Sequence, residues 1–220
     1  MYEFDNELDK PFIEEILINR PLSLMGDFKV KYIADTINKH NLNNILEVGT
    51  FAGGTTYLLA KQFPNKSITT VDLNNFEVYF TKFDHDKHLE MIQRWYPDIT
   101  IQPNSIVKIQ QLYKNNCENI ILFEGNWHTM DISTFDAILI DGDHSITALL
   151  ADLKYAHANM KKPGIIIVDD CALSYIKEHT QEFCIANNLS SSFEFFVTYD
   201  KLNGESIQGN DLCIININPA

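Results

Sequence analysis

Short apolar runs alternate with stretches of helical periodicity along most of this chain. Seven runs have the length and apolar character of strands: 45–48, 67–71, 99–102, 135–140, 165–168, 193–199 and 212–217. The last two are predicted to form an antiparallel hairpin at the edge of a sheet. The other runs are separated by helical patterns, and strands of this kind indicate a mostly parallel sheet covered on both faces.

Apolar residues at helical spacing predict the helices. They recur in an amphipathic segment within residues 1–20, at 26–40, at 55–62, at 105–113 and after Ser145, which is a good N-cap. The prediction is therefore an α/β chain with a Rossmann-like, doubly wound, seven-stranded sheet. Residues 1–40 are expected to pack on the core as an N-terminal helical segment, and residues 41–220 to form the domain proper.

A glycine-rich turn joins the first apolar strand to the next helix. Glu47 lies at the strand end, and Gly49, Gly53 and Thr55 follow in the turn. Glycine lacks a Cβ, so backbone N–H groups in such a turn can approach a bound ligand closely. Asp72 closes the second strand about 20 residues later, where an acid that binds ribose is expected in nucleoside-binding sheets. The same residues also fit a tightly packed turn and a helix cap.

Acidic residues end four of the predicted strands. They are Glu47, Asp72, Asp141 and Asp169. Because ligands of open α/β sheets bind at the carboxyl ends of the strands, this rim predicts a cationic ligand, a metal ion, or both.

Composition narrows the chemistry further. The formal net charge of −13 disfavours nucleic-acid binding, since the surface repels a phosphate backbone. No apolar run approaches the roughly 20 residues that a membrane span needs, and the acidic start does not resemble a signal peptide. The four cysteines are scattered and are expected to be reduced thiols in a cytoplasmic protein.

Taken together, the glycine turn and Asp72 resemble the class I methyltransferases that use S-adenosylmethionine, over residues 46–170. The resemblance implies that Glu47, Gly49, Gly53 and Thr55 line the amino-acid end of that cofactor. It also implies that Asp72 binds the ribose hydroxyls. Ser105, just past the predicted third strand, falls where the family contacts adenine, although the glycine usual there is missing.

The acids after strands four and five resemble those of metal-dependent O-methyltransferases of the macrocin and catechol types. The resemblance implies that Asp141, Asp169 and Asp170 hold Mg²⁺, whose preferred ligands are oxygens. Either Asp143 or His144 then serves as general base. The acceptor is expected to be a hydroxylated small molecule such as a sugar or natural product. The acids also fit a simple role as turn and helix caps.

The sequence also leaves other functions possible on the same fold. An aminopropyltransferase of the spermidine-synthase type, a hydroxylase-like relative and a catalytically silent cofactor-binding module would share this fold. The aromatic-rich residues 73–98 and the stretch 124–128 are candidates for the substrate side, and 73–98 equally for a packed helix or for the contact of a homodimer.

Overall fold

The computed structural model describes residues 2–3, 10–23, 25, 27–73, 96–97, 99–100, 105–199 and 206–218. Its helices are α1 (Lys10–Asn19), α2 (Asp27–Lys39), α3 (Gly54–Gln62), α6 (Ser105–Asn116), α7 (Ile146–Asn159) and α8 (Ser174–Ala186), with a 3-10 turn η1 (Trp127–Thr129). Its strands are β1 (Tyr2–Glu3), β2 (Asn44–Val48), β3 (Ser67–Asp72), β4 (Ile99–Thr100), β5 (Ile120–Glu124), β6 (Ala137–Ile140), β7 (Gly164–Val168), β8 (Ser190–Tyr199) and β9 (Ser206–Ile217).

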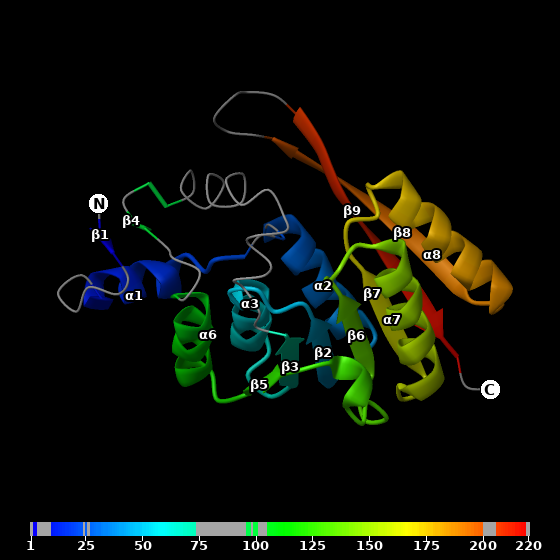
Figure 1. Ribbon diagram of the computed structural model, residues 1–220, viewed down its shortest axis with the longest axis horizontal. Helices are drawn as coiled ribbons and strands as arrows, with labels where there is room; N and C mark the ends of the chain where they lie inside the picture. The colour runs from blue at the N-terminus through cyan, green and yellow to red at the C-terminus, as the bar shows by residue number, and fades with distance from the viewer. Residues whose placement is uncertain are drawn as a thin grey trace.

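Seven of these strands form one twisted sheet in the order β5-β3-β2-β6-β7-β9-β8 (Figure 1). The strands from β5 to β7 are parallel, whereas β9 pairs antiparallel with both β7 and β8. This confirms the doubly wound, seven-stranded sheet with a C-terminal antiparallel hairpin. Because the parallel strands run in one direction, their carboxyl ends meet at one edge.

Side chains alternate between the two faces of the sheet, and each face has its own apolar core. Ile45, Leu139 and Ile167 lie on the face covered by α1, α2, α3 and α6. Leu46 and Ile138 lie on the opposite face, under α7 and α8. The N-terminal helices belong to the first core, since Ile13, Leu17, Ile33 and Ile37 are all fully buried there.

The third strand of the sheet differs from the prediction. The described part of the predicted third strand, Ile99–Thr100, is not in the seven-stranded sheet and pairs with Tyr2–Glu3 in a separate parallel ladder. The third position belongs instead to β5, which pairs with β3. Helix α8 was also not predicted. The insertion at 73–98 lies largely outside the described residues, so neither of its proposed roles is tested.

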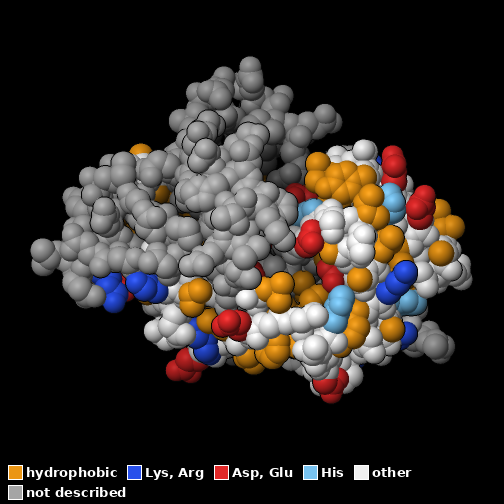
Figure 2. Space-filling view, in the orientation of Figure 1, with side chains coloured by type: hydrophobic (Ala, Val, Ile, Leu, Met, Phe, Trp, Pro, Cys, Tyr) orange, Lys and Arg blue, Asp and Glu red, His pale blue; other side chains and the backbone are white. Residues whose placement is uncertain are grey.

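The surface of the described residues agrees with the acidic composition. Figure 2 shows hydrophobic and acidic side chains interspersed over the described part of one face. Exposed apolar side chains include Leu173 and Tyr175, at the start of α8. Among the described residues, none of the helices combines the length and apolar character needed to span a bilayer.

Candidate active site

The glycine turn after β2 is shaped first by contacts within the chain. Gly49 has a φ of 99° and Gly53 a φ of 81°, both in the left-handed region that glycine adopts without strain. A Cβ on Gly49 would lie only 2.0 Å from the carbonyl oxygen of Asp141. The backbone after β2 therefore lies directly against the backbone after β6. Gly49 is required for this close approach of two loops as well as for its conformation.

Replacing Gly49 with alanine should destabilise the fold by about 2 to 3 kcal/mol, because backbone strain and the clash with Asp141 add. Denaturant unfolding measures this loss. Gly142→Ala is the matched control: its φ is not positive and its added Cβ would meet Val48 at 3.6 Å, an ordinary contact. Equal stabilities of the two variants would contradict the description of this turn.

Glu47 is buried behind the turn rather than directed into an open crevice. Its side chain is 1% exposed and accepts hydrogen bonds from the hydroxyls of Thr56, on α3, and Thr70, on β3. Burial raises the pKa of Glu47 to about 7, against the opposing effect of the two hydroxyl donors. A contact of Glu47 with the amino-acid end of the cofactor stays a prediction.

Thr55 and its neighbour Gly54 face the segment before α2. The hydroxyl of Thr55 lies 2.8 Å from that of Ser23, and a Cβ on Gly54 would lie 2.1 Å from the carbonyl oxygen of Leu22. Thr55 is also buried. The structure thus uses Thr55 to fasten the start of α3 to the N-terminal segment, and a contact with the cofactor stays a prediction.

Asp72 and Glu124 lie side by side where β3 and β5 end. They are register partners in the parallel ladder, and the carboxylate of Asp72 accepts the backbone N–H of Phe51 at 2.9 Å. The carboxylate of Asp72 therefore reaches the glycine turn, as the ribose-binding prediction requires. The sequence analysis named Glu124 only within the stretch 124–128, as a candidate for the substrate side, because residues 120–124 were not recognised as a strand.

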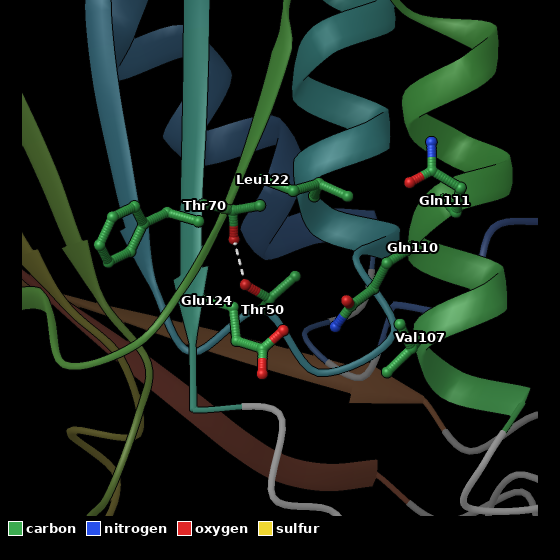
Figure 3. A pocket seen from close by; sticks show the side chains of 8 residues that line it. Thr50, Thr70, Val107, Gln110, Gln111, Leu122 and Glu124 are labelled. Carbon is green, nitrogen blue, oxygen red and sulfur yellow. Dashed lines mark hydrogen bonds between the residues drawn. The ribbon is translucent and has the colours of Figure 1, made fainter.

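A cavity of about 200 Å³ opens beside these residues, between the strand ends and α6. Figure 3 shows Gln110 and Val107 of α6 facing Thr50, Thr70 and Glu124 across it. The hydroxyls of Thr50 and Thr70 are 2.7 Å apart, and Thr70 also donates to Glu47. A hydrogen-bonded row of Glu47, Thr70 and Thr50 thus runs from the buried acid to the cavity wall.

Ser105 does not follow the third strand of the sheet. It is the first residue of α6, fully buried, and its hydroxyl has no hydrogen-bond partner among the described residues. The prediction that Ser105 lies just past strand three is wrong, because the third strand is β5. The loop after β5 begins at Gly125, and a contact of Ser105 with adenine stays a prediction.

Three carboxylates, Asp141, Asp169 and Asp170, form what we call the acid cluster at the ends of β6 and β7. Asp141 and Asp169 follow neighbouring strands on the face covered by α2. Lys29 of α2 pairs with Oδ1 of Asp169, and its Nζ lies 3.6 Å from Oδ1 of Asp170. The side chain of Lys29 is only 3% exposed. A buried ammonium group therefore lies within the cluster.

Mutual repulsion and burial act on the carboxyl groups of the cluster. Burial raises the pKa of Asp141, and the charges of Asp169 and Asp170 raise it further. Burial also raises the pKa of Asp169, although the ammonium group of Lys29 acts in the opposite direction. The backbone N–H of Asp170 donates to Asp169 at 2.7 Å, and Asp170 itself has a φ of 55°. The chain turns sharply at this point, which directs both carboxyl groups toward α2.

The two candidate bases differ in their surroundings. His144 Nε2 lies 3.6 Å from Asp170 Oδ2 and 3.9 Å from Asp141 Oδ1, and the side chain is 33% exposed. Asp143 is exposed, and its carboxylate accepts the backbone N–H of Ser145 at 2.8 Å. The structure therefore directs His144 toward the acid cluster and employs Asp143 in the turn before α7. Ser145 caps α7 as predicted, accepting the N–H of Ala148.

As arranged, these side chains do not fit a magnesium ion. Mg²⁺ binds carboxylate oxygens directly, at about 2.0–2.1 Å, whereas Oδ1 of Asp169 is already paired with the ammonium group of Lys29. Across the described ranges, no three Asp, Glu, His or Cys side chains converge to hold a metal ion. Sequence reasoning missed Lys29, although its spacing gave a signal: Lys29 shares a helical face with Ile33 and Ile37, both buried.

Comparison with known proteins bears on this arrangement. A family profile described as "Methyltransferase domain" matches residues 46–171, which include the glycine turn, Asp72 and the acid cluster. No curated protein matches the chain.

Solved structures share the fold at low sequence identity. The O-methyltransferase from Bacillus cereus, in complex with S-adenosylhomocysteine, is 15% identical, with a TM-score of 0.59 over 96% of this chain and 90% of that one. The O-methyltransferase TomG from Streptomyces achromogenes, with S-adenosylmethionine, is 12% identical, with a TM-score of 0.60 over 98% and 91%. Precorrin-6y C5,15-methyltransferase from Geobacter metallireducens is also 12% identical, with a TM-score of 0.59 over 90% and 92%.

The matched region covers more than half of the chain and contains every strand end that forms the site. The chain therefore belongs to the methyltransferase-domain family and is an S-adenosylmethionine-dependent methyltransferase.

Proposed function

We propose that this chain transfers the methyl group of S-adenosylmethionine to a hydroxyl group of a small molecule. The observation that carries the proposal is the position of His144, partly exposed at the carboxyl end of β6 and within 4 Å of two carboxyl groups. A neutral hydroxyl is a poor nucleophile, so the reaction needs a group that removes its proton. The similar proteins from B. cereus and S. achromogenes are O-methyltransferases, which supports a hydroxyl acceptor.

The residues around the cavity are assigned to the cofactor. Asp72 and Glu124 provide two neighbouring carboxylates for the ribose hydroxyls, and Thr50 provides a hydroxyl at the cavity wall. The glycine turn, with left-handed Gly53 at the start of α3, brings backbone N–H groups to the carboxylate of the methionine part. The residues that would hold S-adenosylmethionine thus lie at the same edge of the sheet as the acid cluster.

In the proposed reaction, the imidazole of His144 accepts the proton of the acceptor hydroxyl. Asp141 and Asp170 lie within 4 Å of Nε2 of His144, and their charge compensates the positive charge that the ring gains. The acceptor oxygen forms a bond to the methyl carbon as the bond from that carbon to sulfur breaks, so the positive charge on sulfur is lost. The contribution of the protein is mainly alignment and exclusion of water.

Magnesium assistance, expected from the acids alone, is not included in the proposal. The ammonium group of Lys29 pairs with two of the three acids that would bind the ion. Without a metal ion to chelate, the acceptor needs no pair of neighbouring hydroxyl groups. The proposed acceptor class is therefore wider: hydroxylated small molecules in general, including sugars and phenols.

Calorimetric titration with S-adenosylhomocysteine tests the cofactor, and transfer of labelled methyl groups to a panel of sugars and phenols tests the acceptor. His144→Ala should bind S-adenosylhomocysteine as the unaltered chain does, but lose about a hundredfold in turnover. Asp143→Ala is the matched control and should retain turnover. Failure to bind the nucleoside would refute the proposal, and a larger loss in Asp143→Ala would transfer the role of base to Asp143.

A further inference from the structure

We propose that Lys29 takes the place of a divalent cation in the acid cluster, so that this methyltransferase works without a metal ion. The consequence for catalysis rests on the proposed function. The structural part, that Lys29 and a metal ion compete for the same carboxylates, stands independently of it. Lys29 contacts carboxylates rather than the reacting atoms and is therefore a positioning residue.

Lys29 forms a buried ion pair. A lysine side chain that is 3% exposed is rare unless its ammonium group is paired. Lys29 meets Asp169, which is equally buried, and its Nζ is 3.6 Å from the more exposed Asp170. The remaining acid, Asp141, has His144 beside it. Each carboxyl group of the cluster thus has a basic side chain within 4 Å.

The helix that carries Lys29 holds it in this place. Lys29 lies in the first turn of α2, and Ile33 and Ile37, one and two turns later on the same face, are fully buried in the core. Withdrawal of Lys29 to make room for a metal ion would leave its ammonium group buried beside that core. The fold therefore favours the ammonium group over an entering ion.

The negative charge of the acid cluster explains why a cation is needed there. Three carboxylates in a small space repel each other unless positive charge is supplied or protons are taken up. A divalent ion is one solution and an ammonium group is another. With Lys29 in place, Asp169 and Asp170 stay fixed at the end of β7, and Asp170 keeps His144 in position for the acceptor hydroxyl. The proton leaves through His144 instead of through a hydroxyl bound to a metal.

Titration with Mn²⁺, followed by electron paramagnetic resonance of the free ion, tests this directly. The unaltered chain should bind no Mn²⁺ at the cluster at micromolar to low millimolar concentrations. Lys29→Met, which keeps an unbranched side chain one atom shorter and removes the charge, should bind Mn²⁺ about a hundredfold more tightly, as expected when one unit of positive charge is removed nearby. Mg²⁺ should displace the bound Mn²⁺.

Lys31→Met is the matched control. Lys31 lies on the same helix and pairs with Asp35 at 2.5 Å, but both side chains are more than half exposed. This variant loses the same charge and should leave Mn²⁺ binding unchanged. If both lysine variants bind Mn²⁺ equally, the effect is one of net charge, and the assignment to Lys29 is overturned.

Three further results would overturn the proposal. The first is tight Mn²⁺ binding by the unaltered chain, a measurement that does not depend on whether Lys29→Met folds. The second is methyl transfer that EDTA abolishes and Mg²⁺ restores. The third is a folded Lys29→Met variant that binds no Mn²⁺. Binding of S-adenosylhomocysteine is measured on the same samples, so failure of the proposed function is distinguished from failure of the Lys29 assignment.

Discussion

Removing either partner of the Lys29–Asp169 pair is expected to destabilise the fold by about 3 kcal/mol, because each single change leaves an uncompensated buried charge. The value is at the lower end for buried pairs, since Asp170 remains 3.6 Å from Lys29 in Asp169→Asn. Asparagine still accepts the N–H of Asp170, so the turn itself is kept. The double variant Lys29→Met/Asp169→Asn removes both charges and should lose clearly less than the sum of the two single changes.

Denaturant unfolding of the four chains gives the coupling energy, expected at about 2 kcal/mol. Lys31→Met and Asp35→Asn form the comparison cycle on the same helix, and their exposed pair should couple by less than about 0.5 kcal/mol. Additive losses at Lys29 and Asp169 would show that the two groups are not paired in solution.

The buried carboxyl group of Glu47 should make stability depend on pH. Its pKa rises from an ordinary value of 4.5 to about 7 in the folded state. The folded chain therefore holds a proton that the unfolded chain releases, and the associated stability is fully present below pH 4.5 and lost as pH rises through about 7. A shift of this size corresponds to about 3 kcal/mol.

Glu47→Gln should remove this contribution, since glutamine cannot ionise and its amide oxygen still accepts from Thr56 or Thr70. Urea unfolding across the range from about pH 5 to 8 is the measurement. Relative to the variant, the unaltered chain should lose about 3 kcal/mol over this range. Glu15→Gln, at an exposed position of α1, should follow the unaltered chain. Parallel curves for the unaltered chain and Glu47→Gln would contradict the burial of this group.

The strands that were predicted correctly are those whose apolar sequence matches their buried position in the middle of the sheet. Strands β6 and β7 are almost entirely apolar because both of their faces are covered, so a continuous apolar run is enough to locate them. Residues 99–102 have similar apolarity, but such a run does not specify which strand it will pair with. At the edge of the sheet, β5 exposes Ile121 and Phe123, and its run was overlooked in favour of the earlier one.

The site was predicted to the extent that it lies at strand ends. Asp72 and the acid cluster follow directly from the rule that parallel strands end at one edge. The contact of Lys29 with Asp169 joins residues 140 positions apart, and a single lysine on an amphipathic helix is ordinarily solvated. The orientation of Glu47 away from the cavity depends on its hydrogen bonds with Thr56 and Thr70. No sequence pattern indicates that these two hydroxyls would donate to Glu47.

Residues 1–40 cannot be removed without loss of contacts on which residues 41–220 depend. The backbone N–H of Leu22 donates to the hydroxyl of Tyr113, the Leu22 carbonyl packs on Gly54, and α2 delivers Lys29 to the acid cluster. A chain shortened to residues 41–220 would keep all seven strands of the large sheet. The acid cluster would lose the ammonium group of Lys29, and the start of α3 would lose the segment that packs on it. In chimeras made between related proteins, residues 1–40 should therefore come from the same parent as β6 and β7.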